Sequence, residues 1–307
     1  MINKRVLGQY FTRYNPFSLH PFLDWYKRFN FRKEIVLEPF AGENSLITFL
    51  INNGMCTRYA AYDIEPKASD VHHRDTLKCF PKGFKVCVTN PPWLAKNSAT
   101  KMKVPFYAGK YDDLYKYSLD KCLSNCECVV AVIPESFIRA DIFQDRLDTF
   151  ISLTSSAFED TAHPVGLALF NPDNTEDIKI FRDNAFIGQL SELIKRRPPI
   201  VNDKSVKFNM PKGNLGLIAL DNCKAASIRF CEPRELTNYK VKKHGRHITI
   251  LDVPFPVRIS DYNDVIRDFR GKTQDVLMTS YRGIRKDGYY RRRLDWQLAR
   301  DIIHCVT

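Results

Sequence analysis

Short apolar segments that alternate with helical stretches are the feature that most constrains the fold of this chain. The strands predicted from this pattern are Ile35–Glu38, Tyr59–Asp63, Phe84–Thr89 and Val129–Ile133. A polar turn after the first strand leads into Leu46–Ile51, which is predicted to be helical. Strands rich in valine and alanine that alternate with helices are typical of parallel βαβ units with both faces of the sheet covered. The chain is therefore predicted to be α/β.

Polar side chains follow these strands where each one ends. Glu38 and Asp63 are the last residues of the first two strands, and Asn90 follows the third. In open parallel sheets, ligands bind beyond the carboxyl ends of the strands. Gly42, in the loop after the first strand, permits a positive φ or a close approach of the backbone to a ligand. An acid at the end of the second strand, here Asp63, commonly accepts hydrogen bonds from ribose hydroxyls.

The turn NPPW (90–93) admits two interpretations. Because proline has a fixed φ and no backbone donor, two prolines end a strand and stiffen the next residues. The turn is then either a rigid connection with Trp93 in the core, or a site. As a site, it would hold the Asn90 side chain, two carbonyls and a flat ring in one arrangement, suited to a planar group with N–H donors.

The positive charge is concentrated in the last third of the chain. The net charge is +12, with 23 Lys and Arg against 22 Asp and Glu in residues 1–190, and 24 against 13 in residues 191–307. We therefore predict a neutral chemical domain, 1–190, and a basic domain that binds a polyanion, 191–307. The segment 195–204, KRRPPIVNDK, is interpreted as a linker or domain edge. The fold of the basic part is not readable from its pattern.

Composition narrows the class of protein. No apolar run reaches the ~20 residues of a membrane span, and the first residues lack the apolar core of a secretion signal. Nine cysteines without such a signal favour free thiols in a reducing, cytoplasmic compartment, close to the nucleoid if the host is bacterial. The group Cys122, Cys126 and Cys128 lacks a clear fourth ligand, so no metal site is expected.

Taken together, the motifs resemble those of S-adenosylmethionine-dependent N6-adenine DNA methyltransferases of the gamma motif order. In chain order these are LGQYFT (7–12), LEPFAGENS (37–45), YDIEP (62–66), RDTL (74–77), VTNPPW (88–93) and VVAVIPESFIRA (129–140). The segment AFEDTAHPVGLALF (157–170) resembles the family's later base-packing segment. The chain departs from the family pattern at Asn44, where a second glycine is usual. The match spans about residues 7–170.

The resemblance implies a Rossmann-like methyltransferase sheet with helices on both faces, followed by a smaller target-recognition domain. It implies S-adenosylmethionine as the cofactor, duplex DNA as the substrate, and in some cases a cognate restriction endonuclease as a functional partner. The implied catalytic residues are Asn90, Pro91, Pro92 and Trp93. The implied cofactor-binding residues are Thr12, Glu38, Phe40, Gly42, Asp63, Ile64 and Asp75. Asp75 on its own could equally be a loop acid or a helix cap.

A base inside a duplex cannot reach such a pocket, so the reaction requires base flipping. Trp93 and Phe158 are the aromatic residues expected to stack on the flipped base, although Phe158 fits a core position as well. In the basic part, the stretch 279–296 interleaves cationic residues with tyrosine and glycine. The residues expected to contact DNA are Arg282, Arg285, Lys286, Arg291, Arg292 and Arg293, the last three at phosphates.

Other functions stay open at this point. Similar Asn-Pro-Pro-aromatic turns serve enzymes that methylate guanine in RNA or glutamine in protein, and N4-cytosine methylation of DNA is a further alternative. A nucleic-acid-binding module without catalytic activity is the alternative from a different class. The recognition sequence, the methylated strand and position, the oligomeric state, the host and pairing with an endonuclease are not readable from the sequence.

Overall fold

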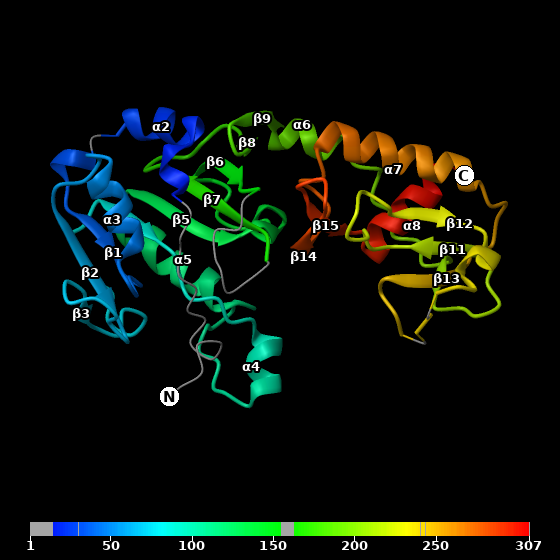
Figure 1. Cartoon of the computed structure of the whole chain (residues 1–307), viewed down its shortest axis with the longest axis horizontal. Helices are drawn as coiled ribbons and strands as arrows, with labels where there is room; N and C mark the ends of the chain where they lie inside the picture. Colours follow the sequence, from blue (N-terminus) through cyan, green and yellow to red (C-terminus); the bar gives the residue numbers. More distant parts are fainter. Residues whose placement is uncertain (1–14, 30, 155–162, 240, 243, 307) are drawn as a thin grey trace. The chain divides into compact units, whose positions relative to one another are not determined.

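The computed structural model describes residues 15–29, 31–154, 163–239, 241–242 and 244–306 (Figure 1). The chain divides into two compact units, residues 1–186 and residues 187–307. Each unit has its own sheet and its own hydrophobic core. They are described one after the other below.

The first unit is built on a mostly parallel sheet. Its strand order is β3 (His72–His73), β2 (Tyr59–Asp63), β1 (Val36–Glu38), β4 (Val86–Thr89), β5 (Cys128–Pro134), β7 (Val165–Phe170), β6 (Leu147–Ser152), β8 (Lys179–Arg182) and β9 (Ala185–Gln189), the last of which continues past the end of the unit at residue 186. The first five strands in this order, from β3 through β5, run parallel to one another. Strand β7 is antiparallel to both of its neighbours, β5 and β6. The four predicted strands are β1, β2, β4 and β5. This order confirms the predicted Rossmann-like sheet of an α/β fold.

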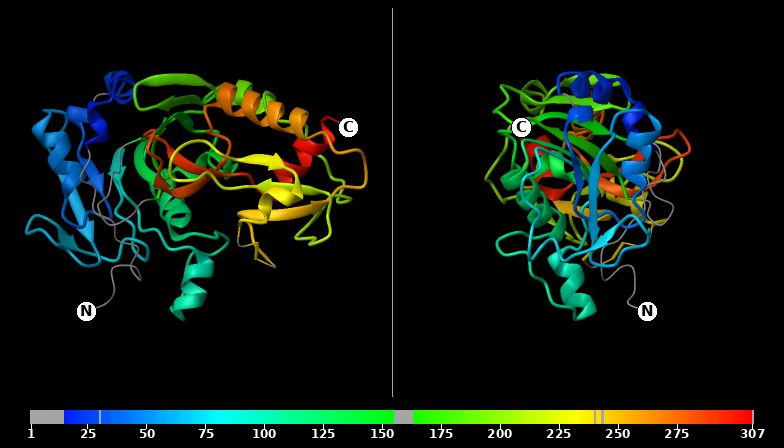
Figure 2. Two further views of the ribbon diagram at one scale, coloured as in Figure 1. Left: turned by 45° about the vertical axis from the view of Figure 1, so that its right-hand side comes forward. Right: turned by 90° about the vertical axis from the view of Figure 1, so that its left-hand side faces the viewer.

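Helices cover both faces of this sheet, as predicted (Figures 1 and 2). The helices of this unit are η1 (Pro16–Ser18), α2 (His20–Lys27), η2 (Phe31–Lys33), α3 (Ser45–Asn52), α4 (Lys96–Met102), α5 (Leu114–Asn125) and η3 (Glu135–Arg139). Of these, α4 stands out from the sheet (Figure 2). Adjacent residues of a strand point to opposite faces of the sheet, and residues two apart point to the same face. Val130 and Val132 of β5 therefore pack in one core with residues of α2 and α3. On the other face, Phe137 of η3 stacks on Phe150, and its ring meets Tyr115 of α5 edge to face.

The second unit has an antiparallel sheet in the order β10 (Lys207–Phe208), β13 (Ile248–Asp252), β11 (Leu215–Ile218) and β12 (Arg229–Cys231). Its helices are α6 (Leu190–Lys195), η4 (Pro233–Leu236), α7 (Ile259–Thr273) and α8 (Trp296–His304). A core of strand residues such as Leu217 and Leu251 packs against α7 and α8 through residues such as Phe269 and Ile302. A separate hairpin, β14 (Thr279–Ile284) and β15 (Tyr290–Arg293), lies between these two helices in the chain.

Residues 195–204, interpreted as a linker or domain edge, are fastened to the second unit and do not form a free linker. Arg197 donates a hydrogen bond from Nη2 to Asp301 Oδ2 at 3.0 Å, and the Val201 N–H donates to Asp301 Oδ1 at 2.9 Å. Asp301 belongs to α8 and is fully buried. The double proline therefore lies within a segment that a buried carboxylate fastens to the second unit, which no local pattern reveals.

All nine cysteines are free thiols, as predicted, and six of them are buried. In the parts of the chain that the structure describes, no helix has both the length and the apolar character needed to cross a bilayer.

Trp25 in α2 offers a test of the first core. Its side chain is 1% exposed, and its indole Nε1–H donates to Asn171 Oδ1 at 2.8 Å. Trp25→Ala is expected to lower the free energy of unfolding by about 3–5 kcal/mol, whereas Trp25→Phe keeps most of the packing and loses chiefly the hydrogen bond, about 1 kcal/mol. Urea unfolding followed by far-UV circular dichroism measures both; equal losses would contradict the assigned roles of packing and hydrogen bond.

Candidate active site

A cavity of about 490 Å³ lies at the carboxyl ends of β1, β2 and β4 in the first unit. Its lining residues are Glu38, Phe40, Ala41, Gly42, Glu43, Ser45, Leu46, Asp63, Ile64, Asp75, Thr76, Leu77, Lys78, Asn90, Pro92, Leu94, Val104, Pro105, Phe106, Tyr107, Leu114 and Tyr117. Most of the side chains are apolar, and the acids and the amide sit among them. Glu38, Asp63 and Asn90, which come from three different strand ends, therefore share one cavity.

Glu38 connects the first loop to the strand that leads into the NPPW turn. Its Oε1 accepts hydrogen bonds from the Phe40 N–H at 3.0 Å and from Thr89 Oγ1 at 2.8 Å. The side chain is 1% exposed. Burial, reinforced by the nearby Asp63 and opposed by these two hydrogen bonds, raises the pKa of Glu38 to about 8. A carboxyl group in this state is suited to a cationic ligand, which would stabilise its ionised form.

Asp63 holds two loops, the one that follows β1 and the one that follows β2. Its Oδ2 accepts from the Gly42 N–H at 2.8 Å, and its Oδ1 accepts from the Glu65 N–H at 2.7 Å. Gly42 has φ 53°, so the positive φ expected of this glycine is present. Burial raises the pKa of Asp63, and the two backbone hydrogen bonds only partly offset this effect. Asp63 thus faces the cavity as a second partly desolvated carboxyl group.

Asn44 occupies the position where the family has its second glycine. It has φ 60°, in the left-handed region that asparagine tolerates better than most residues, and its side chain is 2% exposed. Its Nδ2 donates to Asp70 Oδ2 at 2.7 Å, and the Tyr59 hydroxyl donates to the same oxygen at 2.9 Å. The loop therefore keeps a glycine-like backbone with a side chain that anchors it.

The other predicted cofactor residues also line the cavity. Phe40 is half-buried, and Ile64 is 47% exposed, unusually high for an isoleucine. The Asp75 carboxylate pairs with Lys78 Nζ at 3.0 Å and accepts from the Lys78 N–H at 3.2 Å. Asp75 is therefore a loop acid that holds the turn at residues 76–78, in addition to its place in the cavity wall.

The NPPW turn is held in place by Asp113, the residue that precedes α5. The Asp113 Oδ1 accepts from the Leu94 N–H at 3.1 Å, and Asp113 also caps the helix through the Tyr115 N–H. Burial raises the pKa of Asp113 to about 6. Among the described residues, the cavity lining includes Asn90 and Pro92 but neither Pro91 nor Trp93.

Trp93 is half-buried and packs against the core that contains α2 and α3. This placement agrees with the first interpretation of the turn, in which Trp93 is a core aromatic. Its stacking on a base stays a prediction. Thr12, the LGQYFT motif and Phe158 lie outside the residues that the structure describes.

Sequence reasoning missed the aromatic residues that line the cavity together with Glu38 and Asp63. Phe106 and Tyr107, after α4, and Tyr117, in α5, line the cavity. Tyr107 is 79% exposed. A run of lysines and aromatic residues directly after the NPPW turn was the available signal. It carries no motif, and only the fold brings it back to the strand ends.

In the second unit, two of the predicted DNA contacts do not agree with the structure. Arg285 is 6% exposed and Arg292 is 3% exposed. Arg285 Nη1 donates to Asp221 Oδ2 at 2.7 Å, and Arg292 donates from Nη1 to Ser280 Oγ at 2.9 Å and from its backbone N–H to Asp221 Oδ2 at 3.1 Å. These side chains would have to leave buried partners to reach DNA, so we withdraw both.

The remaining cationic residues of the hairpin are more accessible. Arg282 and Lys286 are exposed, and Arg291 and Arg293 are half-buried. Arg291 also donates to the Asp221 carbonyl and lies over the Tyr281 ring, with 5.2 Å between guanidinium carbon and ring centroid. Contact of these four with DNA stays a prediction.

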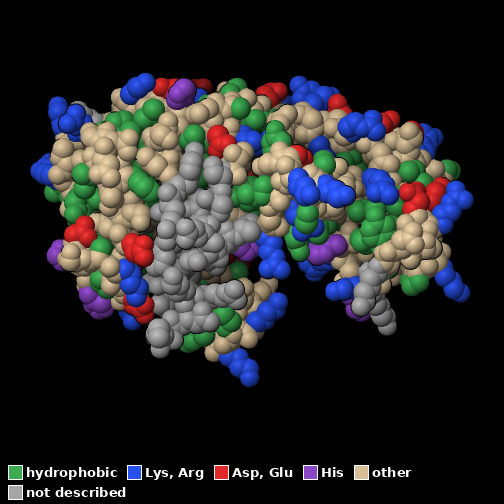
Figure 3. Space-filling model, viewed as in Figure 1, with side chains coloured by type: hydrophobic (Ala, Val, Ile, Leu, Met, Phe, Trp, Pro, Cys, Tyr) green, Lys and Arg blue, Asp and Glu red, His purple; other side chains and the backbone are tan. Residues whose placement is uncertain are grey.

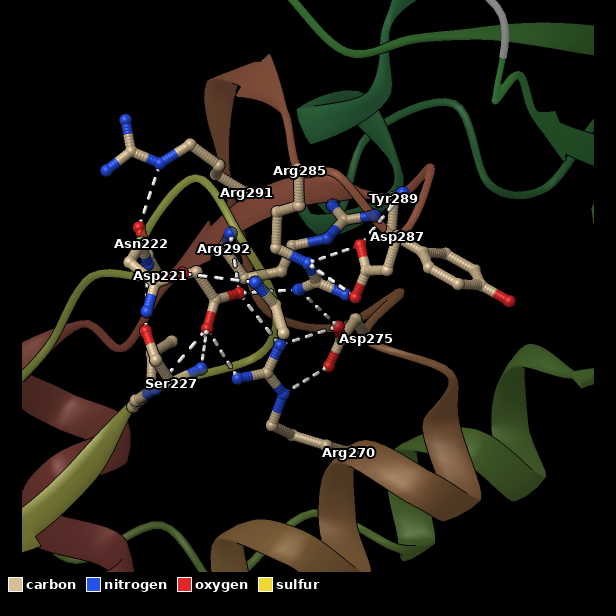
Figure 4. A network of polar contacts seen from close by, with 12 residues as sticks. Asp221, Asn222, Ser227, Arg270, Asp275, Arg285, Asp287, Tyr289, Arg291 and Arg292 are labelled. Carbon is tan, nitrogen blue, oxygen red and sulfur yellow. Dashed lines mark hydrogen bonds and ion pairs between the residues drawn. The ribbon is translucent and has the colours of Figure 1, made fainter.

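Asp221 is the centre of the network that holds the hairpin (Figure 4). Its carboxylate is fully buried and pairs with Arg285 and with Arg270 of α7 at 2.7 and 2.8 Å. Burial alone would raise the pKa of Asp221, but the hydrogen bonds and charge of Arg270 hold it below its usual value. Arg270 also binds Asp275, so one helix, one loop and the hairpin converge on two acids.

Comparisons with known proteins give distant likenesses only. No protein-family model matches the sequence, and a search of curated proteins found none that is similar. Among solved structures, the chain resembles the type I restriction-modification methyltransferase subunit of Streptococcus thermophilus, with 14% identity, TM-score 0.36 and coverage of 57% of this chain and 48% of that one. For the M protein of the type I restriction enzyme EcoKI, identity is 15%, TM-score 0.39 and coverage 57% and 49%.

A provisionally assigned RNA methyltransferase from Pyrococcus horikoshii has 13% identity, TM-score 0.39 and coverage of 55% of this chain and 90% of that one. The chain thus spans about half the length of the two modification subunits. The fold assignment rests on the strand order of this chain itself.

Removal of the central acid tests the network of the second unit. Asp221→Asn leaves Arg270 and Arg285 buried without a full counter-charge, and it is expected to cost about 3–5 kcal/mol of stability. It should also speed hydrogen exchange of residues 279–293. The matched control is Asp264→Asn, which breaks the exposed pair with Arg267 and should change stability by less than about 0.5 kcal/mol. Similar losses in the two variants would show that Asp221 does not hold the hairpin.

Proposed function

We propose that this chain is a site-specific DNA methyltransferase that transfers a methyl group from S-adenosylmethionine to N6 of an adenine flipped out of duplex DNA. The observation that carries the proposal is the shared cavity of Glu38, Asp63 and Asn90 at the carboxyl ends of β1, β2 and β4. A free-standing modification enzyme, either solitary or functionally paired with a restriction endonuclease, fits this activity. The basic second unit would serve as the target-recognition domain.

The residues of the cavity fit the cofactor. S-adenosylmethionine has a cationic ammonium and sulfonium, ribose hydroxyls and an adenine ring. The two buried carboxyl groups, Glu38 and Asp63, both have pKa values raised by burial, so both would be stabilised in their ionised form by a cationic or hydrogen-bond-donating ligand. Asp63 would accept from the ribose hydroxyls, and Phe40, Ile64 and Asp75 would border the rest of the molecule.

The protein's contribution to the chemistry is positioning. When bound, S-adenosylmethionine supplies a methyl group on a sulfonium, which is a good leaving group. The exocyclic amine of adenine is a poor nucleophile because its lone pair is delocalised into the ring. In the proposed mechanism, the Asn90 side-chain oxygen and the Pro91 carbonyl accept its two N–H bonds, which favours a tetrahedral nitrogen with a directed lone pair. Proline at positions 91 and 92 keeps these acceptors fixed.

The alternative substrates use the same turn. RNA guanine and protein glutamine also present planar nitrogens, and DNA cytosine presents an exocyclic amine. The charge of residues 191–307, 24 cationic against 13 acidic residues, favours a nucleic acid over a protein. The LGQYFT segment favours DNA among the nucleic acids.

Asn90→Ala tests the proposed role of the turn. It removes an acceptor whose bonds strengthen toward the transition state, so kcat is expected to fall at least about a hundredfold while the Kd for S-adenosylmethionine changes little. Transfer of a labelled methyl group to DNA, RNA and protein, measured side by side, gives the rate and the substrate class. Asn52→Ala, an exposed change at the end of α3, is the control. Normal turnover by Asn90→Ala, or transfer to RNA or protein in preference to DNA, would refute the proposal.

The raised pKa of Glu38 predicts the pH dependence of cofactor binding. Because the pKa of Glu38 in the free protein is about 8, the group is mostly protonated below that pH. A cationic ligand favours its ionised form, so binding releases a proton, and affinity should rise with pH and level off above about pH 8. Over the same range the free protein should lose stability as pH rises, because the folded state holds this proton more tightly than the unfolded chain does.

Calorimetry in two buffers with different ionisation enthalpies measures the released proton. Glu38→Gln is the comparison, because it keeps the size of the side chain and has no group to ionise. Its affinity should no longer depend on pH in this range. An equal pH dependence in both proteins would assign the proton to another group.

A further inference from the structure

The net charge of the first unit is close to zero, but a lysine-rich segment of this unit lies next to the cavity. Residues 95–111, called the arm below, contain Lys96, Lys101, Lys103 and Lys110 and no Asp or Glu. All four lysines are exposed. Within the described chain, no ion pair joins any of them to an acid, whereas Lys116, just beyond the arm, pairs with Asp112 at 2.7 Å. Like charges kept together in this way repel one another, so a polyanionic partner would stabilise them.

The arm is fastened to the catalytic turn at both of its ends. Ala95 and Asp113 form an antiparallel bridge, the Lys96 N–H donates to the Asp112 carbonyl at 2.8 Å, and the Leu114 N–H donates to the Leu94 carbonyl at 3.0 Å. Both views of Figure 2 show that α4 stands out from the sheet of this unit. Figure 3 shows Lys and Arg side chains on this projection. The arm is therefore a closed, projecting loop that begins and ends next to the NPPW turn.

After α4, the arm turns back into the cavity wall. Lys103 ends the helix with φ 55°, a left-handed conformation that costs a residue other than glycine about 1–2 kcal/mol. The next four residues, 104–107, all line the cavity that Asn90 lines. Tyr107 is 79% exposed, so most of its ring is open to solvent at the wall of the cavity. An exposed aromatic ring therefore lies between Lys103 and Lys110 in the arm.

We propose that the arm holds the DNA strand that carries the target base. Its lysines contact phosphates on either side of the flipped nucleotide, and Tyr107 stacks on the extruded base. This rests on the function proposed above. It adds a second region of DNA contact, within the catalytic unit and separate from the basic unit.

The combination of groups favours a nucleic-acid strand over an acidic peptide. Lysine side chains are suited to phosphates as point charges. Aromatic side chains stack on bases of any sequence, and such pairs of lysines and rings are typical of surfaces that bind single nucleotide strands. A flipped nucleotide offers both features at one place, a base face and two adjacent phosphates.

The test of the lysines is a binding measurement that needs no methyl transfer. Fluorescence anisotropy with a labelled DNA duplex of mixed sequence gives the slope of log K against log salt. In Lys101→Gln/Lys103→Gln/Lys110→Gln, each lost phosphate contact should reduce the slope by about 0.9, so a total reduction between about 2 and 3 is expected. The control is Lys27→Gln/Lys33→Gln/Lys82→Gln, which removes three exposed lysines of the same unit and should leave the slope unchanged. Equal slopes in wild type and arm variant would overturn the lysine contacts.

Tyr107 is tested by the rate of methyl transfer to DNA. Because the side chain is largely exposed, Tyr107→Ala should fold normally, and it is expected to lower kcat by about tenfold or more. Tyr107→Phe keeps the ring and should retain the wild-type rate. A normal rate in Tyr107→Ala, or a loss confined to S-adenosylmethionine affinity, would overturn the stacking role.

The two kinds of measurement separate this inference from the proposed function. A reduced salt slope in the lysine variant of a protein that methylates no DNA would support the arm contacts and refute the methyltransferase activity on DNA. An unchanged slope in a protein that does methylate DNA would refute the arm alone. Lysine substitutions that reduce methylation of a protein substrate, with DNA binding unchanged, would assign the arm to a peptide and also overturn the inference.

Discussion

The desolvation of two carboxyl groups at one sheet edge is the constraint on which the candidate site depends. Glu38 and Asp63 end neighbouring parallel strands, and each is almost fully buried. The hydrogen bonds that offset part of this burial come from the loops that enclose the cavity, at Phe40, Gly42 and Glu65, and from Thr89 beside the NPPW turn. The acids therefore shape the cavity wall, and their raised pKa values show that this wall alone does not fully satisfy them.

Local patterns predicted the elements whose burial is set by strand alternation. Strands β1, β2, β4 and β5 and helix α3 could be read from apolar segments, and their polar ends predicted the position of the cavity. Features that depend on contacts between distant residues could not be read. Asp301 binds a segment about a hundred residues away in the chain. Asp221 binds residues about fifty to seventy positions away. The sequence therefore indicated a linker at 195–204 and surface contacts at Arg285 and Arg292.

The net charge of each part of the chain does not show which charged side chains are exposed and which are buried. In the second unit, part of the excess of cations is internal, because Arg270 and Arg285 are bound to buried acids. In the first unit, near neutrality of the sum conceals four exposed lysines that lie together in the arm. The distribution of charge over buried and exposed positions is therefore more informative about possible DNA contacts than the sum for each domain.

Asn44 shows how a loop can follow a left-handed backbone path without a glycine. Its left-handed torsion reproduces what the smaller residue would adopt, and the amide contact with Asp70 adds a restraint that glycine cannot provide. A sequence profile that demands two glycines would discard this chain, whereas a search on torsion angles would retain it. Chains that carry asparagine in such a loop are accordingly best sought by backbone conformation.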